Sequence, residues 1–229
     1  KPVKVTEYDG TSLRFEQRLY PGVWGPSIDT LLFCKGLRSV DLSSVKSAVE
    51  IGCGSGYISK YVAEHASQLM SLTLADINPK AIECAMQQQF PVHPTFVPGD
   101  GIKHIQGKRY DLLLCNPPYI PRPRSIDDNA YEGISLLHYL LTQGGQHLTD
   151  KGRIVTNISS LCAEQASRAM AKSGVNVREL AAMDVPLKVY NVLNSPVWME
   201  YLLEKKGLKK EKKNGYDYWQ RITIVEVRG

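Results

Sequence analysis

Four consecutive residues, Asn116-Pro117-Pro118-Tyr119, bring together groups that can hold a planar amino group. The side-chain oxygen of Asn116 and the main-chain carbonyl of Pro117 can each accept one N–H bond from an NH₂ group. The lone pair of an amide or aromatic amine is delocalised, and two fixed acceptors favour positive charge on such a nitrogen. The prolines limit reorganisation, and the ring of Tyr119 can stack on a flat group. The alternative is a plain turn, since neither proline can donate to a sheet.

A glycine-rich segment, "EIGCGSG" at 50–56, is the second candidate for chemistry. Glycine permits sharp turns and lets a ligand approach the main chain closely. The spacing is G-x-G-x-G, which differs from the G-x-G-x-x-G fingerprint of dinucleotide sites. The preceding carboxylate suits a cationic ligand better than a pyrophosphate. The candidate cofactor-binding residues of this segment are Glu50, Gly52, Cys53, Gly54 and Gly56.

Two further carboxylates follow apolar runs later in the chain. Asp76 ends the run "SLTLAD", and a carboxylate there can accept both hydroxyls of a ribose. Asp100 follows "PTFVPG" and can accept a hydrogen bond from an adenine amino group. Taken singly, each acid is also a normal helix N-cap or turn residue. Ile77 and Gly101, which directly follow the two acids, complete the candidate set.

The elements that position these residues alternate between strands and helices. Such alternation predicts a Rossmann-like α/β fold: a doubly wound, mostly parallel sheet of seven strands with an antiparallel closing strand. Parallel strands end at one edge of the sheet, where ligands bind, so the candidate residues should meet there. The expected strands are 47–52, 71–76, 94–100, 110–116, 152–159, 175–185 and 218–229, and the expected helices are 57–68, 78–89, 133–148, 162–174 and 195–207.

The two ends of the chain differ from this pattern. Residues 1–45 form a preface rich in turn-forming residues, and 46–229 form the sheet domain. Residues 195–217 are expected to be a helix followed by a lysine-rich insertion before the last strand. Six lysines stand at 205, 206, 209, 210, 212 and 213, and we expect either a solvated loop or a phosphate-binding surface there.

Composition sets broad limits on the class of protein. The chain has 229 residues, 43% of them hydrophobic and 22% charged, which is normal for a globular protein. No apolar run approaches the ~20 residues needed to span a membrane, and no signal peptide is visible. The five cysteines show no paired spacing, so we expect reduced thiols in a cytoplasmic protein and no metal site. A net charge of +5 is compatible with nucleic-acid binding.

The glycine segment and the carboxylates Glu50, Asp76 and Asp100 together resemble the class I methyltransferases that use S-adenosyl-L-methionine (SAM). The resemblance covers roughly residues 24–185. It implies that the glycine loop packs against the methionine part of SAM, that Asp76 holds the ribose and that Asp100 meets the adenine. The N-P-P-Y sequence resembles the signature of family members that methylate planar nitrogen, which implies that Asn116, Pro117, Pro118 and Tyr119 are catalytic, with Asn116 also touching SAM.

The segment "GPSIDTLLF" at 25–33 resembles the P-x-x-D-T-x-L-L sequence of HemK-type glutamine methyltransferases, and "ADINPKAIECA" resembles their second-strand region. This resemblance implies a glutamine side-chain amide as the acceptor, in a protein such as a translation release factor. It also implies that the preface covers the cofactor cleft, with Thr30 near the carboxylate of SAM.

Two other functions stay open. The same N-P-P-Y chemistry serves enzymes that methylate adenine N6 or guanine N2 in RNA or DNA, and the lysine run would then contact phosphates. The third alternative is an inactive SAM-binding domain that serves a partner subunit. The chain is also compatible with being the catalytic half of a longer, fused protein.

Overall fold

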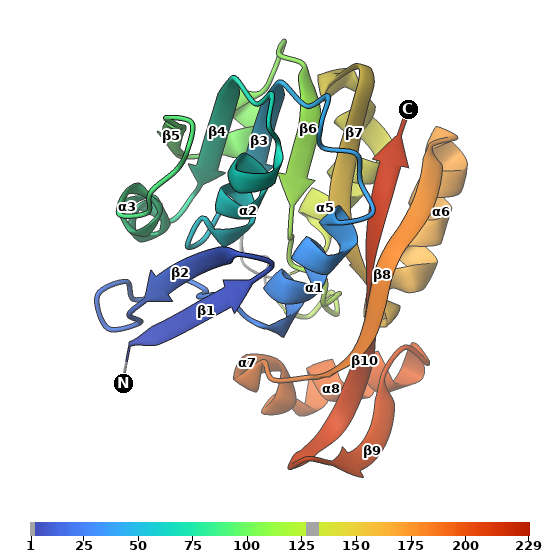
Figure 1. Ribbon diagram of the computed structural model, residues 1–229. Helices are drawn as coiled ribbons and strands as arrows, with labels where there is room; N and C mark the ends of the chain where they lie inside the picture. Colours follow the sequence, from blue (N-terminus) through green and yellow to red (C-terminus); the bar gives the residue numbers. More distant parts are fainter. Residues whose placement is uncertain (1–2, 127–132) are drawn as a thin grey trace.

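The computed structural model describes residues 3–126 and 133–229, and these build one large sheet with helices on both faces (Figure 1). The strand order is β5-β4-β3-β6-β7-β10-β8, with β9 paired to β10. Neighbours from β5 to β7 run parallel, and β10 runs antiparallel between β7 and β8. The strands are β3 (Ser47–Ile51), β4 (Ser71–Asp76), β5 (Thr95–Pro98), β6 (Tyr110–Cys115), β7 (Leu148–Ser159), β8 (Asn176–Pro186), β9 (Lys209–Lys213) and β10 (Tyr216–Arg228).

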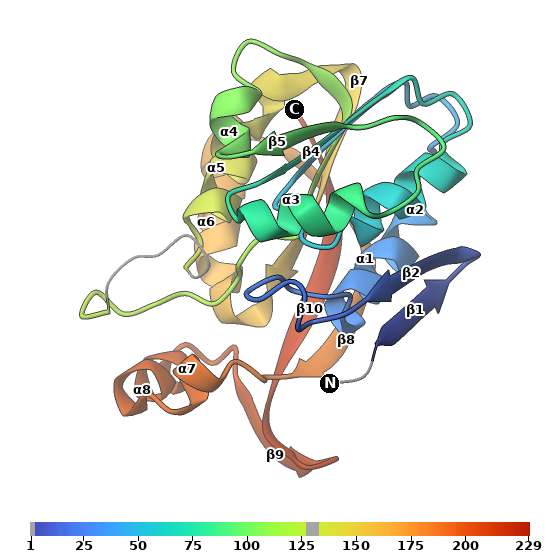
Figure 2. The ribbon, with the colours of Figure 1, turned by 90° about the vertical axis from the view of Figure 1, so that its left-hand side faces the viewer.

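Strand β6 shows why the apolar runs of the sequence become central strands. Leu112 and Leu114 pack into one hydrophobic core, and Leu113 and Cys115 pack into the core on the opposite face. A parallel strand covered on both faces needs apolar residues at every position. Figure 2 shows one helical layer on each side of the sheet. The first layer holds α1 (Ile28–Leu37), α2 (Tyr57–His65) and α3 (Pro79–Met86), and the second holds α4 (Gly101–His104), α5 (Ser135–Gln143) and α6 (Ala163–Ser173).

The predicted Rossmann-like fold with an antiparallel closing strand is confirmed, with two local differences. The helix expected over 133–148 is shorter, because α5 ends at Gln143 and a 3-10 turn (Gly144–His147) follows. A Cβ at Gly144 would lie 2.5 Å from Ile154 Cδ1, so this position needs glycine for packing rather than a good helix former. The second difference is that four of the six lysines in the lysine run lie in a strand rather than a loop. This strand, β9, precedes β10 in the chain and pairs with it as an eighth strand of the sheet.

The N-terminal segment begins with a hairpin, β1 (Lys4–Tyr8) and β2 (Thr11–Phe15), which the sequence analysis did not predict. Its turn is Asp9-Gly10, with both residues at positive φ. Asp-Gly between alternating residues is a strong signal for this type of turn. The hairpin packs on α2, where the hydroxyl of Tyr57 donates to the carbonyl of Thr11 over 2.8 Å and Tyr61 donates to Asp9 over 2.7 Å.

The C-terminal unit consists of α7 (Tyr190–Leu193), α8 (Pro196–Glu204), β9 and the first half of β10. It has its own small core, which includes Ile120 from the segment after β6. The indole N–H of Trp198 donates to the carbonyl of Pro121 over 2.9 Å. The unit lies below the sheet in Figure 1, at the edge where β4 and β6 end, so it adjoins the predicted site. None of the described helices is long and apolar enough to cross a membrane.

Candidate functional site

The glycine segment forms a tight loop between β3 and α2. Gly52, Gly54 and Gly56 all have positive φ, which glycine adopts without strain. The N–H groups of Gly52 and Cys53 donate to the carbonyl of Ala75 at the end of β4. Gly56 is the N-cap of α2, so the loop leads directly into a helix N-terminus. The loop is therefore fixed by main-chain geometry and leaves a side-chain-free surface at the edge of the sheet.

Asp76 ties this loop to the neighbouring strand. One carboxylate oxygen accepts from the N–H of Gly54 and the other from the N–H of Asn78, each over 2.9 Å. Burial raises the pKa of Asp76 above its ordinary value, and the two N–H bonds oppose this effect. Each oxygen has a second lone pair, so the carboxylate can still accept bonds from a ligand. Asp76 thus lies beside the glycine loop, as the parallel sheet predicts.

Asp100, Ile77 and Gly101 lie next along the same edge. The N–H of Gly99 donates to the carbonyl of Asp76, which brings the ends of β4 and β5 together. Asp100 is exposed and is the N-cap of α4, as the sequence allowed. One of its oxygens accepts from the N–H groups of Ile102 and Lys103, and the other oxygen is not used in the cap. Ile77 is 45% exposed and offers an apolar surface to a flat ring. A Cβ at Gly101 would lie 2.6 Å from Ile51 Cδ1, so glycine is required for packing.

Glu50 lies deeper than the other carboxylates. Its side chain is buried, and one oxygen accepts from both the N–H and the hydroxyl of Ser59 on α2, over 3.2 and 2.7 Å. Burial raises the pKa of Glu50 to about 8, although the bonds from Ser59 oppose the shift. The observed partner of Glu50 is therefore the first turn of α2, and its contact with a cationic ligand stays a prediction.

Asn116 follows the end of β6 and is held from the next strand. Its side-chain oxygen accepts from the amide N–H of Asn157 on β7. Asn157 is fully buried, and its own oxygen has no hydrogen-bond partner among the described residues. The sequence analysis missed Asn157, although a polar amide inside the apolar run "GRIVTNIS" is a usable signal. Asn157 fixes the side chain of Asn116 and leaves one lone pair of its oxygen for another donor.

Tyr119 is held from α1 on the N-terminal side. Its hydroxyl donates to Asp29 over 2.7 Å, and both side chains are half-buried. Burial raises the pKa of both groups above their ordinary values. Gln220 on β10 opposes the rise in the pKa of Tyr119, and its side-chain oxygen accepts from the hydroxyl of Ser159 over 2.6 Å. The Asn-Pro-Pro-Tyr segment is therefore connected to both the N-terminal helix and β10.

Thr30 directly follows Asp29 in the first turn of α1. Its hydroxyl accepts from the N–H of Ser27 over 3.1 Å and so caps the start of the helix. The position of Asp29 shows that this turn lies beside Tyr119. The contact between Thr30 and a cofactor carboxylate stays a prediction.

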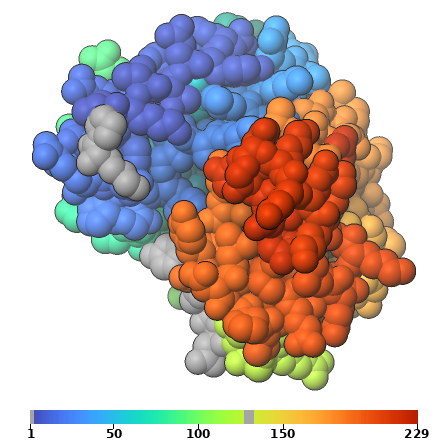
Figure 3. Space-filling model, turned by 90° about the horizontal axis from the view of Figure 1, so that it is seen from below, coloured from blue at the N-terminus to red at the C-terminus, as the bar shows by residue number. Residues whose placement is uncertain are grey.

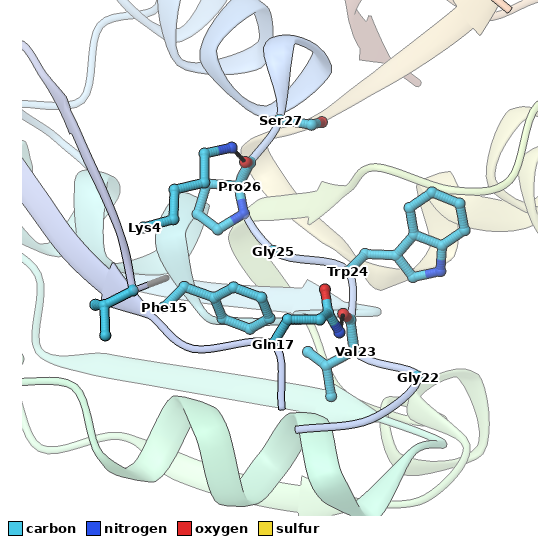
Figure 4. A pocket seen from close by; sticks show the side chains of 10 residues that line it. Lys4, Phe15, Gln17, Gly22, Val23, Trp24, Gly25, Pro26 and Ser27 are labelled. Carbon is cyan, nitrogen blue, oxygen red and sulfur yellow. Dashed lines mark hydrogen bonds between the residues drawn. The ribbon is translucent and has the colours of Figure 1, made fainter. Parts of the chain in front are cut away.

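The segment before α1 lies close to the glycine loop. A Cβ at Gly54 would be 3.2 Å from the carbonyl oxygen of Trp24, so the two main chains nearly touch. Figure 4 shows the shallow pocket that this segment lines, with Phe15 beneath Pro26 and the indole of Trp24 directed away from them. Trp24 is 69% exposed. The main chain of the preface therefore approaches the glycine loop at Trp24, whose indole is exposed.

All five cysteines are buried and free of disulfides. Residues 3–126 and 133–229 contain no cluster of three or more His, Cys, Asp or Glu side chains placed to hold a metal ion.

The fold and the site define the class of protein: a Rossmann-like α/β domain with a glycine loop and carboxylates at the carboxyl edge of its sheet. The L11 ribosomal protein methylase of Lactobacillus delbrueckii subsp. bulgaricus has the same fold, with a TM-score of 0.55 at 13% identity, over 91% of this chain and 83% of that one. Residues 29–190 match the family described as the methyltransferase small domain. The chain therefore belongs to the methyltransferase small domain family.

Several curated relatives match a part of the chain. Human methyltransferase HEMK2 is 31% identical over 45% of this chain and 52% of its own length. The ribosomal RNA large subunit methyltransferase G of Psychromonas ingrahamii is 30% identical over 43% of this chain and 27% of its length. The release factor glutamine methyltransferase of Moorella thermoacetica is 25% identical over 62% and 56%. The chain thus spans about half or less of the length of each relative. The matches to HEMK2 and to the release factor glutamine methyltransferase confirm the HemK-like resemblance.

A double-mutant cycle measures the contact between Tyr119 and Asp29. Hydrogen bonds to charged groups contribute about 1.5–3 kcal/mol, so Asp29→Ala and Tyr119→Phe should each lower the free energy of unfolding. The double variant should lose less than the sum, by about 1–3 kcal/mol. Urea unfolding followed by circular dichroism gives all three values, and strict additivity would show that the bond contributes nothing.

Glu50→Gln tests the buried carboxyl. Because its pKa is raised from 4.5 to about 8, the unfolded chain ionises first, and the carboxyl lowers the stability of the fold as pH rises through this window. The Tm of Glu50→Gln minus the Tm of the wild type should therefore grow between pH 5 and pH 8. Each kcal/mol of difference in the free energy of unfolding shifts Tm by roughly 2–4 °C. Equal Tm differences at both pH values would contradict the shift.

A matched control is Glu226→Gln. The side chain of Glu226 is also buried, but Arg178 and Arg228 bond it, and these bonds lower its pKa despite the opposing effect of burial. This variant should lower the Tm at both pH values, because it removes a carboxylate that the fold stabilises in its charged form.

Proposed function

We propose that this chain transfers a methyl group from SAM to a planar NH₂ group, and that the acceptor is the side-chain amide of a glutamine in a protein. The observation that carries the proposal is the position of Asn116. Its oriented amide lies at the sheet edge that also holds the glycine loop and Asp76. A methyl donor on the loop and a nitrogen acceptor at Asn116 would therefore be neighbours.

We assign residues at this edge of the sheet to the parts of SAM that their chemistry suits. Gly52, Cys53, Gly54 and Gly56 would face the methionine part of SAM, because their main chain is free of large side chains. Asp76 would accept both ribose hydroxyls with its remaining lone pairs. Ile77 would cover the adenine, and Asp100 with Gly101 would meet its amino edge. Thr30 and Glu50 would interact with the charged ends of the amino-acid part.

SAM supplies a methyl group on a positively charged sulfur. Asn116 and the carbonyl of Pro117 would each accept one N–H of the target group and so direct its lone pair toward that methyl. In this transfer the N–C bond would form as the S–C bond breaks, the electron pair of the S–C bond would stay on sulfur, and the nitrogen would then release one proton to water. Pro118 and Tyr119 would keep the acceptors and the flat target aligned, and alignment supplies most of the rate enhancement.

The glutamine acceptor is supported by the HemK-like segment at 25–33 and by the relative named as a release factor glutamine methyltransferase. We infer that the acceptor protein presents its glutamine on an accessible loop, as a translation release factor would. In this assignment residues 1–45 form a cover over the cofactor cleft, and residues 46–229 form the methyltransferase domain. Within this cover, the main chain of Trp24 lies next to Gly54, and its indole is exposed.

A second candidate acceptor is a base of RNA or DNA, at adenine N6 or guanine N2. The observation in its favour is β9, an exposed strand of the C-terminal unit that carries four lysines. One of the relatives is named as a ribosomal RNA methyltransferase. An inactive SAM-binding domain is the third alternative, and the complete set of Asn116, Asp76 and Asp100 argues against it.

Asn116→Ala and Asp76→Ala should separate catalysis from cofactor binding. Asn116→Ala removes an acceptor for the target NH₂ and at most one contact with SAM, so SAM affinity should stay within a few fold while turnover falls on the order of 10²-fold. Asp76→Ala should instead weaken SAM binding by about tenfold or more, because bonds to a charged carboxylate are lost. Calorimetry gives the affinities, and wild-type turnover in Asn116→Ala would disprove the proposed role.

The acceptor class is tested with radiolabelled SAM and a cell lysate, divided between protease and nuclease treatment. Transfer to a glutamine-bearing protein predicts that protease removes the label and that nuclease does not. Loss of label to nuclease would establish the second candidate. Binding of SAM without any labelled product, in a lysate lacking the native enzyme, would favour the inactive domain.

A further inference from the structure

One short segment carries the charge imbalance of the whole chain. Residues 205–213 contain six lysines and one glutamate, a net charge of +5, and the complete chain also has a net charge of +5. The remaining residues are therefore neutral overall. Four of the six lysines lie in β9, and all five residues of that strand are exposed. We call β9 and its partner residues Tyr216–Trp219 of β10 the lysine hairpin.

The lysine hairpin is a fixed element rather than a solvated loop. Its turn is Asn214-Gly215, with both residues at positive φ, as tight hairpins require. The register pairs Tyr218 with Lys210 and Trp219 with Lys209. The indole N–H of Trp219 donates to the carbonyl of Glu211 over 2.9 Å. Side chains alternate along a strand, so the lysines project from both faces of this ribbon.

Aromatic rings lie among these cations. Lys213 Nζ is 5.8 Å from the ring centre of Trp219, and Lys188 Nζ is 4.9 Å from that of Tyr216. Tyr216 is 36% exposed. Lysines that alternate with partly exposed rings suit a polymer of anionic and flat groups, because the charges can bind phosphates and the rings can stack on bases.

The hairpin is connected to the proposed catalytic segment through β10. Directly after Trp219 comes Gln220, which is close enough to Tyr119 to lower its pKa, although burial has the larger and opposite effect. Tyr119 and Tyr218 both pack against the small core of the C-terminal unit. Lys188 is close enough to Asp29 to lower its pKa, although burial has the larger and opposite effect. Figure 3 shows the C-terminal unit beside the N-terminal segment on the face seen from below.

We propose that the lysine hairpin binds the phosphodiester backbone of a nucleic acid next to the methyl-transfer site. Lysine is a point charge that contacts phosphates without reading bases, so the binding should not depend on sequence. This inference concerns a binding surface and does not rest on the nature of the methyl acceptor. Lysines on an edge strand also discourage pairing with other chains. That role explains neither the neighbouring rings nor the concentration of the net charge in this segment.

The test measures binding of fluorescein-labelled single-stranded 20-mers of RNA and DNA by anisotropy, across a series of salt concentrations. The wild type should bind, and its affinity should fall linearly on a logarithmic salt scale. Replacing Lys209, Lys210, Lys212 and Lys213 by glutamine should make this slope shallower by up to about 3, since each phosphate contact on a single strand contributes about 0.7. The same four positions changed to arginine should keep the wild-type slope.

A matched control changes the same number of exposed lysines at the opposite edge of the sheet: Lys46, Lys108, Lys151 and Lys172. That variant should bind as the wild type does. The proposal would be overturned if the hairpin and control variants had equal salt slopes. It would also be overturned if the wild type bound polyglutamate and neither nucleic acid. SAM affinity, measured on the same samples, should be unchanged in every variant. Asn116→Ala should bind nucleic acid as the wild type does, which would show that this binding does not depend on the proposed catalytic residue.

Discussion

The site depends on one carboxylate that joins two loops. Asp76 accepts from Gly54 on one side and from Asn78 on the other, so the glycine loop and the start of α3 share a single anchor. The glycines alone would leave their loop free to take many conformations, because glycine has little backbone preference. The same carboxylate is the group that we assign to the ribose. Cofactor recognition and loop geometry therefore depend on the same two oxygen atoms.

Much of the fold could be predicted because its signals are local. Apolar runs such as "DLLLC" define buried parallel strands, and turn residues mark where they stop. Once the strands are placed, topology brings their carboxyl ends to one edge, which is why the glycine loop, Asp76 and Asn116 were grouped correctly without any contact being known. The antiparallel closing strand was also predicted, although its connection to β8 contains α7, α8 and β9.

The contacts that orient the site could not be predicted in this way. Asn157 bonds Asn116 from a different strand, and Asp29 bonds Tyr119 although the two are 90 residues apart in the sequence. Neither pairing leaves a periodic signal, because each depends on which strands become neighbours. The lysine run misled for a related reason: solvation explains its charge, but its pairing with β10 decides its structure. Burial of Glu50 likewise depends on how α2 packs over the sheet.

The position of β10 has a consequence for the order of assembly. This strand is last in the sequence, yet it lies inside the sheet and is the partner through which β8 joins β7. Until β10 has been synthesised, β7 presents an open edge and β8 has no place in the sheet. Open edges invite pairing with other chains, so the nascent chain is most exposed to aggregation between the synthesis of β8 and that of β10. The sheet becomes complete only when the thirteen-residue strand β10 is inserted.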